Sequence, residues 1–308
     1  MMPMWRPPEW ASPSGLNKKY NYYISKTHTI MKSMKCLLAA AAVLLAAACG
    51  PKKADAPKVL VLYYSQTENT QTVAQAIATA LGADMEAILP VVPYDGTYQE
   101  TIARGMTERQ SGVLPEIHPL NVNLADYDVI FLGYPIWYGT YALPVATLLD
   151  QVDLSGKKVV PFCTFGSGGL DSSVKDLAAK QPGAEILPGS GVRAARMTAG
   201  PAEVDRFLKV GGFVEGDVVK LDDFPAPHPA TEEEAAIFDA AVGTYPMIQA
   251  TAVSTTSRPV PGGVEYIFTA KDKPREGMTP PPGMEPQEMK IYVIAEDGKA
   301  PEFTQVVR

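Results

Sequence analysis

Residues 58–77 read KVLVLYYSQTENTQTVAQAI, and this stretch predicts how the first half of the chain folds. The run Val59–Tyr64 is continuously apolar, as in a strand that is buried on both faces of a sheet. From Thr70 to Leu81 the apolar residues recur with the period of a helix and share one face. The residues between these two runs carry hydroxyl and amide side chains, and none of them is basic. The stretch therefore predicts a buried strand that passes into a helix through a polar turn.

Length and charge limit the classes of protein to consider. The chain has 308 residues and a formal net charge of −7 at pH 7, and it contains no cluster of lysines and arginines. Because domains commonly have about 150 residues, this length predicts two of them. Nucleic-acid binding requires a basic surface that neutralises phosphates, so we expect no nucleic-acid partner.

A secretion signal precedes the first strand. After a positively charged flank, the 13 residues Cys36–Ala48 form an apolar run that is too short to span a bilayer as a helix. Small residues then lead to Cys49. We expect translation to begin at Met31 or Met34, because residues 1–30 precede the signal and show neither a helical nor a strand period.

This segment resembles the signal of bacterial lipoproteins. The resemblance implies cleavage before Cys49, which would become the lipidated N-terminus of an exported protein. Its acyl chains would hold the protein at a bacterial cell membrane, on the periplasmic or the outer surface, because each buried CH₂ adds about 0.8 kcal/mol. An ordinary secretory signal with an incidental cysteine is the alternative. With Cys49 lipidated, Cys163 is the only free thiol of the mature chain, so no internal disulfide can form.

The rest of the chain divides into two parts of different pattern. After residue 57, apolar runs alternate with helical patterns, whereas after residue 229 one helical pattern precedes several strand patterns. We therefore predict a spurious extension plus signal peptide at 1–48, a tether at 49–57, an α/β domain at 58–212, a linker at 213–229 and an α+β domain at 230–308.

The α/β domain is predicted to form an open, doubly wound parallel sheet of five strands. Its strands are continuous apolar runs, which is typical of strands that helices cover on both faces. The predicted strands are 59–64, 85–89, 128–134, 157–164 and 184–187, and the predicted helices are 70–81, 98–107, 145–151, 170–180 and 201–209. In such a sheet, ligands bind beyond the carboxyl ends of the strands, where the strand order reverses. The loops after the first, third and fourth strands are therefore the candidate site.

All three loops suit a flat aromatic ligand that carries a phosphate. After the first strand, short polar side chains lie at a helix start, where unpaired backbone N–H groups and the helix dipole attract an anion. After the third strand, residues 133–144 read GYPIWYGTYALP, with four aromatic residues. After the fourth strand, residues 164–169 read TFGSGG, which offers mostly backbone groups. No GxxxxGK[ST] loop occurs, which argues against hydrolysis of nucleoside triphosphates.

Together these motifs resemble the flavodoxin family, over about residues 58–210. Family members carry a Ser-Gln-Thr-Gly-Asn-Thr type of loop and a Gly-x-Pro-Ile-Trp loop, and they bind FMN without a covalent bond. The resemblance implies phosphate contacts from Ser65, Thr67, Asn69 and Thr70, ring contacts from Pro135, Ile136, Trp137 and Tyr138, and ring-edge contacts from Thr164, Phe165, Gly166, Ser167 and Gly168. Whether Trp137 or Tyr138 stacks on the ring stays open.

Glu68 departs from the family pattern, which has glycine at this position. A carboxylate in the first turn of a helix interacts favourably with the helix dipole, but one that faced a bound phosphate would repel it. We therefore expect the Glu68 side chain to point outward. If the loop requires a positive φ at this residue, glutamate would be strained where glycine is not, and the affinity for FMN would fall.

Other candidate motifs are weaker. Residues 189–194 match G-x-G-x-x-A, but no second βα unit with a ribose-binding acid follows, so we expect no dinucleotide there. His118 and His228 both lie next to proline in predicted loops, which leaves no recognisable metal cluster or catalytic pair. Cys163, at the end of a buried strand, is expected to be a small core residue.

The C-terminal part has its own resemblance. Its predicted helix is 231–242 and its predicted strands are 248–256, 264–271, 289–295 and 303–307. The helix begins with Thr231-Glu-Glu-Glu234, which matches a capping box. This pattern resembles a cystatin-like domain, with SRPVPGGVEY at 257–266 in the place of its Gln-Val-Val-Ala-Gly hairpin. Arg258, Pro259 and Pro261 depart from that motif, which puts protease inhibition in doubt even on the same fold.

We expect an FMN-binding electron-transfer protein, or an FMN-dependent reductase of a small acceptor such as a quinone, that a lipid anchors to a membrane. The sequence indicates neither the electron donor and acceptor nor the oligomeric state. Two alternatives remain: a cofactor-free flavodoxin-like scaffold that presents the C-terminal domain to a partner, and a cystatin-like inhibitor. Protein that is colourless and leaves FMN fluorescence unquenched would exclude the flavin hypothesis.

Overall fold

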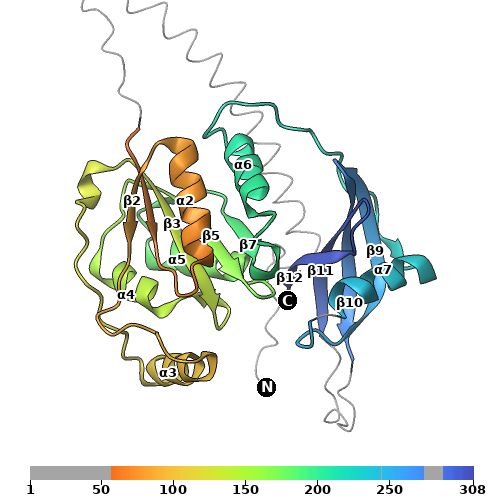
Figure 1. The fold of residues 1–308 in the computed structure, drawn as a ribbon, viewed down its shortest axis with the longest axis horizontal. Helices are drawn as coiled ribbons and strands as arrows, with labels where there is room; N and C mark the ends of the chain where they lie inside the picture. The colour runs from red at the N-terminus through yellow and green to blue at the C-terminus, as the bar shows by residue number, and fades with distance from the viewer. Residues whose placement is uncertain (1–56, 244, 274–286) are drawn as a thin grey trace, which may run out of the picture. The chain divides into compact units, whose positions relative to one another are not determined.

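Two β-sheets organise the chain (Figure 1). The structure, a computed structural model, describes residues 57–243, 245–273 and 287–308. The predicted N-terminal extension, the signal peptide and the lipidation site at Cys49 lie outside the described residues.

The first sheet belongs to the α/β part of the chain. Its elements are β1 (Val59–Tyr63), α2 (Asn69–Leu81), β2 (Asp84–Ala87), α3 (Tyr98–Ser111), β3 (Val129–Trp137), β4 (Thr140–Tyr141), α4 (Leu143–Gln151), β5 (Lys158–Phe165), α5 (Leu170–Lys180), β6 (Glu185–Ile186), β7 (Ser190–Arg193) and α6 (Gly200–Val210). The strand order is β2-β1-β3-β5-β6, and these strands are all parallel. The chain passes from β1 outward to β2 and returns across β1 to β3, as in doubly wound sheets. The predicted fold class is confirmed.

Helices cover both faces of this sheet. Along β1, Leu60 and Leu62 are buried against a layer that includes α4 and α5, whereas Val61 and Tyr63 are buried against α2 and α6. Burial on both faces explains why the strand is continuously apolar in the sequence. Each such side chain stabilises the fold by roughly 1.5–3 kcal/mol.

The third strand is longer than predicted. It continues to Trp137, because β4 pairs with Ile136 and Trp137 in antiparallel register. The connection consists of Tyr138 and Gly139, which both have positive φ, 52° and 84°. Two such residues form the tight hairpin turn that matches the twist of a strand pair. The predicted loop after the third strand is therefore largely a β-hairpin.

The fifth strand position is occupied by two short strands. β6 pairs with the start of β5 and β7 pairs with its end. Only the first was predicted, and most of the G-x-G-x-x-A stretch lies in β7 instead of a loop. Pro188 and Gly189 separate the two strands, and proline has no N–H to donate to a ladder.

Helix α3 lies beyond the carboxyl ends of the strands rather than on a face of the sheet (Figure 1). It begins with a capping box, in which the Thr97 side chain accepts from the Glu100 N–H and Glu100 accepts from the Thr97 N–H. Only Thr101 and Gly105 are buried in it. The helix therefore contributes little to the sheet core, but it lies at the end where the candidate site was predicted.

The second sheet is antiparallel. Its elements are β8 (His228–Pro229), α7 (Glu232–Val242), β9 (Ala250–Val260), β10 (Gly263–Asp272), β11 (Glu288–Glu296) and β12 (Glu302–Val307), in the order β12-β11-β10-β9-β8. The predicted capping box of α7 forms between Thr231 and Glu234. Phe238 of this helix packs edge-on against Phe268 of β10, with ring centroids 5.2 Å apart. The predicted α+β pattern is confirmed, whereas the cystatin-like identity and the domain boundaries stay predictions.

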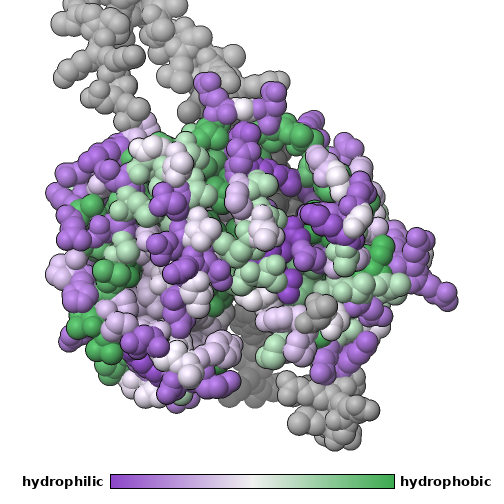
Figure 2. Space-filling view, viewed as in Figure 1, coloured by the Kyte–Doolittle hydropathy of each residue, from purple (hydrophilic) through white to green (hydrophobic). Residues whose placement is uncertain are grey.

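Figure 2 shows hydrophilic and hydrophobic residues interspersed over the face in view. In the stretches that the structure describes, no helix is both long enough and apolar enough to cross a bilayer.

Gly133 in β3 allows the ring of Phe162 to approach the strand backbone closely, and this contact leads to a prediction. A Cβ at this position would overlap with the ring of Phe162, which is 1% exposed and cannot move without repacking its neighbours. We predict that Gly133→Ala lowers the free energy of unfolding by about 3 kcal/mol, because overpacking of a core strains its side chains and backbone.

Gly200→Ala at the start of α6 is the matched control. The nearest atom to its added Cβ is 3.7 Å away, and alanine is favoured over glycine in helices by about 0.5–1 kcal/mol, so no loss is expected. Urea unfolding of both variants measures the difference. Equal transition midpoints for Gly133→Ala and Gly200→Ala would contradict the close approach of Phe162 to Gly133.

Candidate functional site

The three predicted loops meet at one end of the first sheet. β1 pairs with both β2 and β3, and β3 pairs with β5, so their carboxyl ends lie side by side. The hydroxyl oxygens of Thr70 and Thr164 lie 2.8 Å apart and are buried, which links the first loop to the third directly. The structure thus brings together residues that are far apart in sequence, at the place where the strand order reverses.

The start of α2 has no side-chain cap. Its N-cap residue is Glu68, which makes no side-chain hydrogen bond to the helix, and no acidic residue follows in the first turn. Helices α3 and α7 each begin with a complete capping box, whereas α4, α5 and α6, like α2, have no side-chain cap. The first N–H groups of a helix have no partner within the helix, so those of α2 remain available to an anion.

Two buried hydroxyls at this end also lack partners. Among the described residues, the buried side-chain atoms without a hydrogen bond are Ser65 Oγ, Thr140 Oγ1 and Thr255 Oγ1. Ser65 follows β1 and Thr140 lies in the hairpin after β3, so two of the three belong to the predicted site. An unsatisfied buried polar group costs about 1–3 kcal/mol and calls for an explanation, such as a ligand that supplies the missing partner.

The turn between β1 and α2 has a positive φ at Glu68, which is the condition under which the sequence predicts strain. Glu68 has φ 63° and ψ −12°, in the left-handed region that favours glycine. Both the N–H and the hydroxyl of Thr72 donate to the Glu68 carbonyl oxygen, at 2.8 and 3.0 Å. The Glu68 side chain is exposed, as expected. Thr67 is also exposed, and Asn69, half-buried, is the first residue of α2.

Aromatic side chains form one wall of the site. Trp137 is half-buried and lies edge-on to Tyr64 and Tyr94, with centroid distances of 5.7 and 5.0 Å. Tyr138 is 37% exposed, and its hydroxyl donates to the Ile102 carbonyl oxygen of α3 at 2.8 Å. Trp137 is therefore held by its aromatic neighbours, whereas Tyr138 is held by the helix. Pro135 and Ile136, both half-buried, precede them in β3.

Helix α3 and the residues before it were not predicted as part of the site. Gln66 Nε2 donates to the Tyr94 carbonyl oxygen at 3.3 Å and to Thr101 Oγ1 at 3.0 Å. Arg104 lies over the Tyr94 ring, 3.8 Å from its centroid. These contacts attach α3 to the loop after β1. No local pattern marks them, because each partner is at least 28 residues from Gln66 along the chain.

The loop after β5 offers mostly backbone. Phe165 ends β5 with its ring buried in the core, and the Thr164 hydroxyl is engaged by Thr70. Gly166 is exposed, and its carbonyl oxygen accepts from Arg193 Nε at 3.1 Å. The half-buried Ser167 accepts from the N–H of Val306 at 2.6 Å. Two carbonyl groups of this loop are therefore fixed by other parts of the chain.

Other features of the described residues do not extend the site. A hollow of about 380 Å³ beside α3, lined by Val91, Val92 and Val113 among others, contains none of the predicted site residues. No three His, Cys, Asp or Glu side chains in the described ranges are grouped to hold a metal ion. Cys163 is buried, as expected, and burial raises the pKa of its thiol well above the ordinary value.

Comparison with known protein families agrees with the fold of this part of the chain. A family model described as flavodoxin matches residues 58–200. The α/β domain is flavodoxin-like. Among solved structures, the flavodoxin-like domain is similar to a protein from Bacteroides eggerthii described as a flavoprotein, at 28% identity and a TM-score of 0.45, over 50% of this chain and 98% of that one. It is also similar to a flavoprotein from Lactobacillus acidophilus in complex with FMN, at 26% identity and a TM-score of 0.41, over 44% of this chain and 93% of that one.

The left-handed backbone conformation of Glu68 leads to a testable prediction. A non-glycine residue in this region is strained by about 1–2 kcal/mol, and glycine would relieve this strain. Glycine also gives the unfolded chain more conformational freedom, which cancels part of the gain in stability. We therefore expect Glu68→Gly to raise the free energy of unfolding by about 0.5–1 kcal/mol in urea denaturation. Glu68→Ala is the control, because it removes the carboxylate and keeps the strain. An equal gain in both variants would assign the effect to charge instead of backbone conformation.

Proposed function

We propose that the flavodoxin-like domain binds FMN without a covalent bond and transfers electrons, by itself or as a reductase of a small acceptor such as a quinone. The observation that carries the proposal is the unpartnered, buried hydroxyl of Ser65 beside the uncapped start of α2. An anion at this position would receive hydrogen bonds from both the hydroxyl and the first N–H groups of the helix. The donor set is uncharged and fits a phosphate that is held by hydrogen bonds and the helix dipole.

The other site residues would contact the rest of the phosphate, the ring and the polar edge of the ring. Thr67 and Asn69 flank Glu68 and add polar groups to the phosphate cradle, while Thr70 joins the cradle to Thr164. Trp137 and Tyr138 offer an aromatic wall to the ring, next to Pro135 and Ile136. The loop after β5 offers backbone groups to the polar edge of the ring. FMN, when bound, supplies the redox chemistry, and the protein supplies position and electrostatics.

The aromatic wall also limits contact between the ring and water. Tyr64 is 3% exposed and Tyr94 is 6% exposed, and both pack against Trp137. Burial raises the pKa of the Tyr64 hydroxyl far above its ordinary value, so this residue stays neutral beside the site. A ring bound against this wall would exchange electrons in a less polar environment than water.

Ser65→Ala tests the proposal, because it should act in opposite directions on stability and on binding. In the flavin-free protein the substitution removes an unsatisfied hydroxyl, so the free energy of unfolding should stay equal or rise. The affinity for FMN should fall about tenfold, because a hydrogen bond to a charged group is lost. Quenching of FMN fluorescence measures the affinity. In a chain that begins at Cys49, Trp137 is the only tryptophan and its quenching gives a second measurement.

Thr255→Val is the matched control for this experiment. It removes another buried hydroxyl without a partner among the described residues, in β9 of the second sheet, and should leave the affinity for FMN unchanged. Wild-type protein that is colourless and does not quench FMN would exclude the proposed function. It would favour the cofactor-free scaffold or the inhibitor instead.

We also propose that Cys49 carries the lipid that anchors the protein to a bacterial cell membrane. The support is the apolar run and small residues that precede this cysteine. Wild-type protein should label with a fatty acid and sediment with membranes, whereas Cys49→Ser should do neither. Mass spectrometry of the native N-terminus should find the chain starting at residue 49. Recovery of residues 1–30 in the native protein would contradict the predicted start at Met31 or Met34.

A further inference from the structure

Strand β12 of the second sheet lies directly against the loop after β5. The N–H of Val306 donates to the Ser167 carbonyl oxygen, and a Cβ on Gly168 would overlap with the Val306 carbonyl oxygen. A Cβ on Gly166 would lie 2.9 Å from the hydroxyl of Tyr245. The glycines of this loop are therefore needed where the second sheet approaches it.

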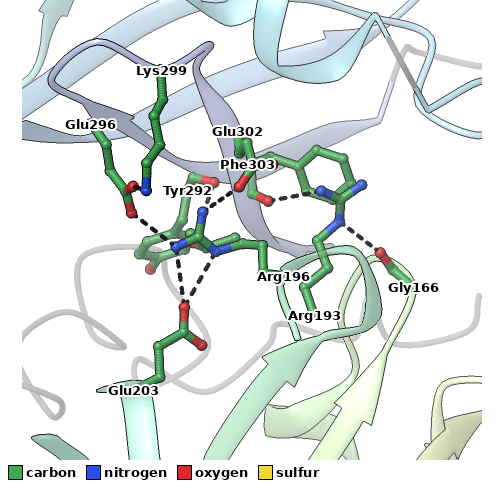
Figure 3. A network of polar contacts seen from close by, with 10 residues as sticks. Gly166, Arg193, Arg196, Glu203, Tyr292, Glu296, Lys299, Glu302 and Phe303 are labelled. Carbon is green, nitrogen blue, oxygen red and sulfur yellow. Dashed lines mark hydrogen bonds and ion pairs between the residues drawn. The ribbon is translucent and has the colours of Figure 1, made fainter. Parts of the chain in front are cut away.

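Arg193 connects the same loop to β12 (Figure 3). Its Nε donates to the Gly166 carbonyl oxygen at 3.1 Å, and its Nη1 donates to the Phe303 carbonyl oxygen at 3.3 Å. The guanidinium also lies over the Phe303 ring, 3.5 Å from the centroid. Arg193 is 7% exposed, so these contacts are shielded from water. The carbonyl groups of Gly166 and Ser167 are thus both held by groups that belong to β12 or contact it.

Arg196 forms a second connection a few residues further on. It is 6% exposed, and its guanidinium bonds to Glu203 of α6 and to Glu302 of β12, with Glu296 of β11 within 3.5 Å (Figure 3). Burial alone would lower the pKa of Arg196, but the carboxylates of Glu203 and Glu302 outweigh it and raise the pKa above its ordinary value. The cation therefore stays charged and keeps β12 next to the loop.

The loop needs such support. Three of the four residues 166–169 are glycine, and glycine loses more conformational freedom on ordering than other residues do. Ordering each residue costs about 1–2 kcal/mol of conformational entropy. When other contacts order a loop before a ligand arrives, the ligand does not bear that cost and binds more tightly.

We infer that the C-terminal sheet positions the ring-edge loop of the flavin site, with Arg193 as the positioning residue and the Arg196–Glu302 pair as the contact that holds β12 in place. The inference rests on the proposed binding of FMN. It makes the second sheet a component of the flavin site, where the sequence had suggested an independent module.

Two variants of the full-length chain test this inference. Arg193→Met keeps an apolar contact with Phe303 but removes both hydrogen bonds, and Glu302→Lys places a cation beside Arg196. Glu288→Lys is the matched control, because it makes the same charge change on β11 at an exposed pair with Lys271. Urea unfolding of the three variants identifies any that fails to fold, and the other test variant then decides.

The measurements are hydrogen exchange of the Val306 amide, which donates to Ser167, without flavin, and affinities for FMN and riboflavin. In both test variants we expect this amide to exchange about tenfold faster, because local opening becomes easier. FMN and riboflavin should each bind about tenfold more weakly, by the same factor, because the loop contacts the ring and not the phosphate. Ser65→Ala should instead weaken FMN more than riboflavin, which separates ring positioning from a general loss of the site. The control should match the wild type throughout.

The possible outcomes separate the inference from the proposed function. Wild-type protein that binds no FMN refutes the proposed function, and with it the positioning of a flavin site. The exchange measurement still tests the contact between β12 and the loop in that case, because unchanged exchange in the variants would refute that contact. Wild-type protein that binds FMN, with test variants equal to the control in exchange or in flavin affinity, overturns the inference and leaves the proposed function intact.

Discussion

The parallel pairing of β1 with β2 on one side and β3 on the other is the constraint on which the site depends. Because the strand order reverses there, the loops after β1 and β3 diverge to opposite faces of the sheet and leave space between them. Together with the pairing of β3 and β5, it places the end of β5 where Thr164 meets Thr70. The aromatic wall, the uncapped start of α2 and the loop after β5 all surround this one place.

The sequence predicted most where burial is simplest. β1 and β5 are buried on both faces, so their apolar runs are unambiguous. β7 was missed because Ser190–Arg193 carries no apolar run and becomes a strand by pairing with β5, which is distant in sequence. The extension of β3 was missed because a tyrosine with positive φ at position 138 gives no turn signal. Tyr94, Thr101 and the Arg193 contacts depend on partners distant in sequence, which no local pattern encodes.

The turn at Glu68 shows how a family pattern can be explained by backbone geometry. The left-handed φ would explain the glycine that the flavodoxin pattern has at this position, and the exposed carboxylate is compatible with glutamate here. Because the turn also leaves the start of α2 without a side-chain cap, strain and unsatisfied donors occur at the same place. Such a place is stabilised by a bound anion more than an ordinary helix start would be.

The position of β12 has a consequence for solubility. This strand is the last of its sheet, and an edge strand with free N–H and C=O groups is a template for pairing with another molecule. The loop after β5 occupies part of that edge through the bond from Val306 to Ser167. The flavodoxin-like domain thus shields its neighbour from edge-to-edge association, and a chain in which the two lose contact would expose a surface prone to aggregation.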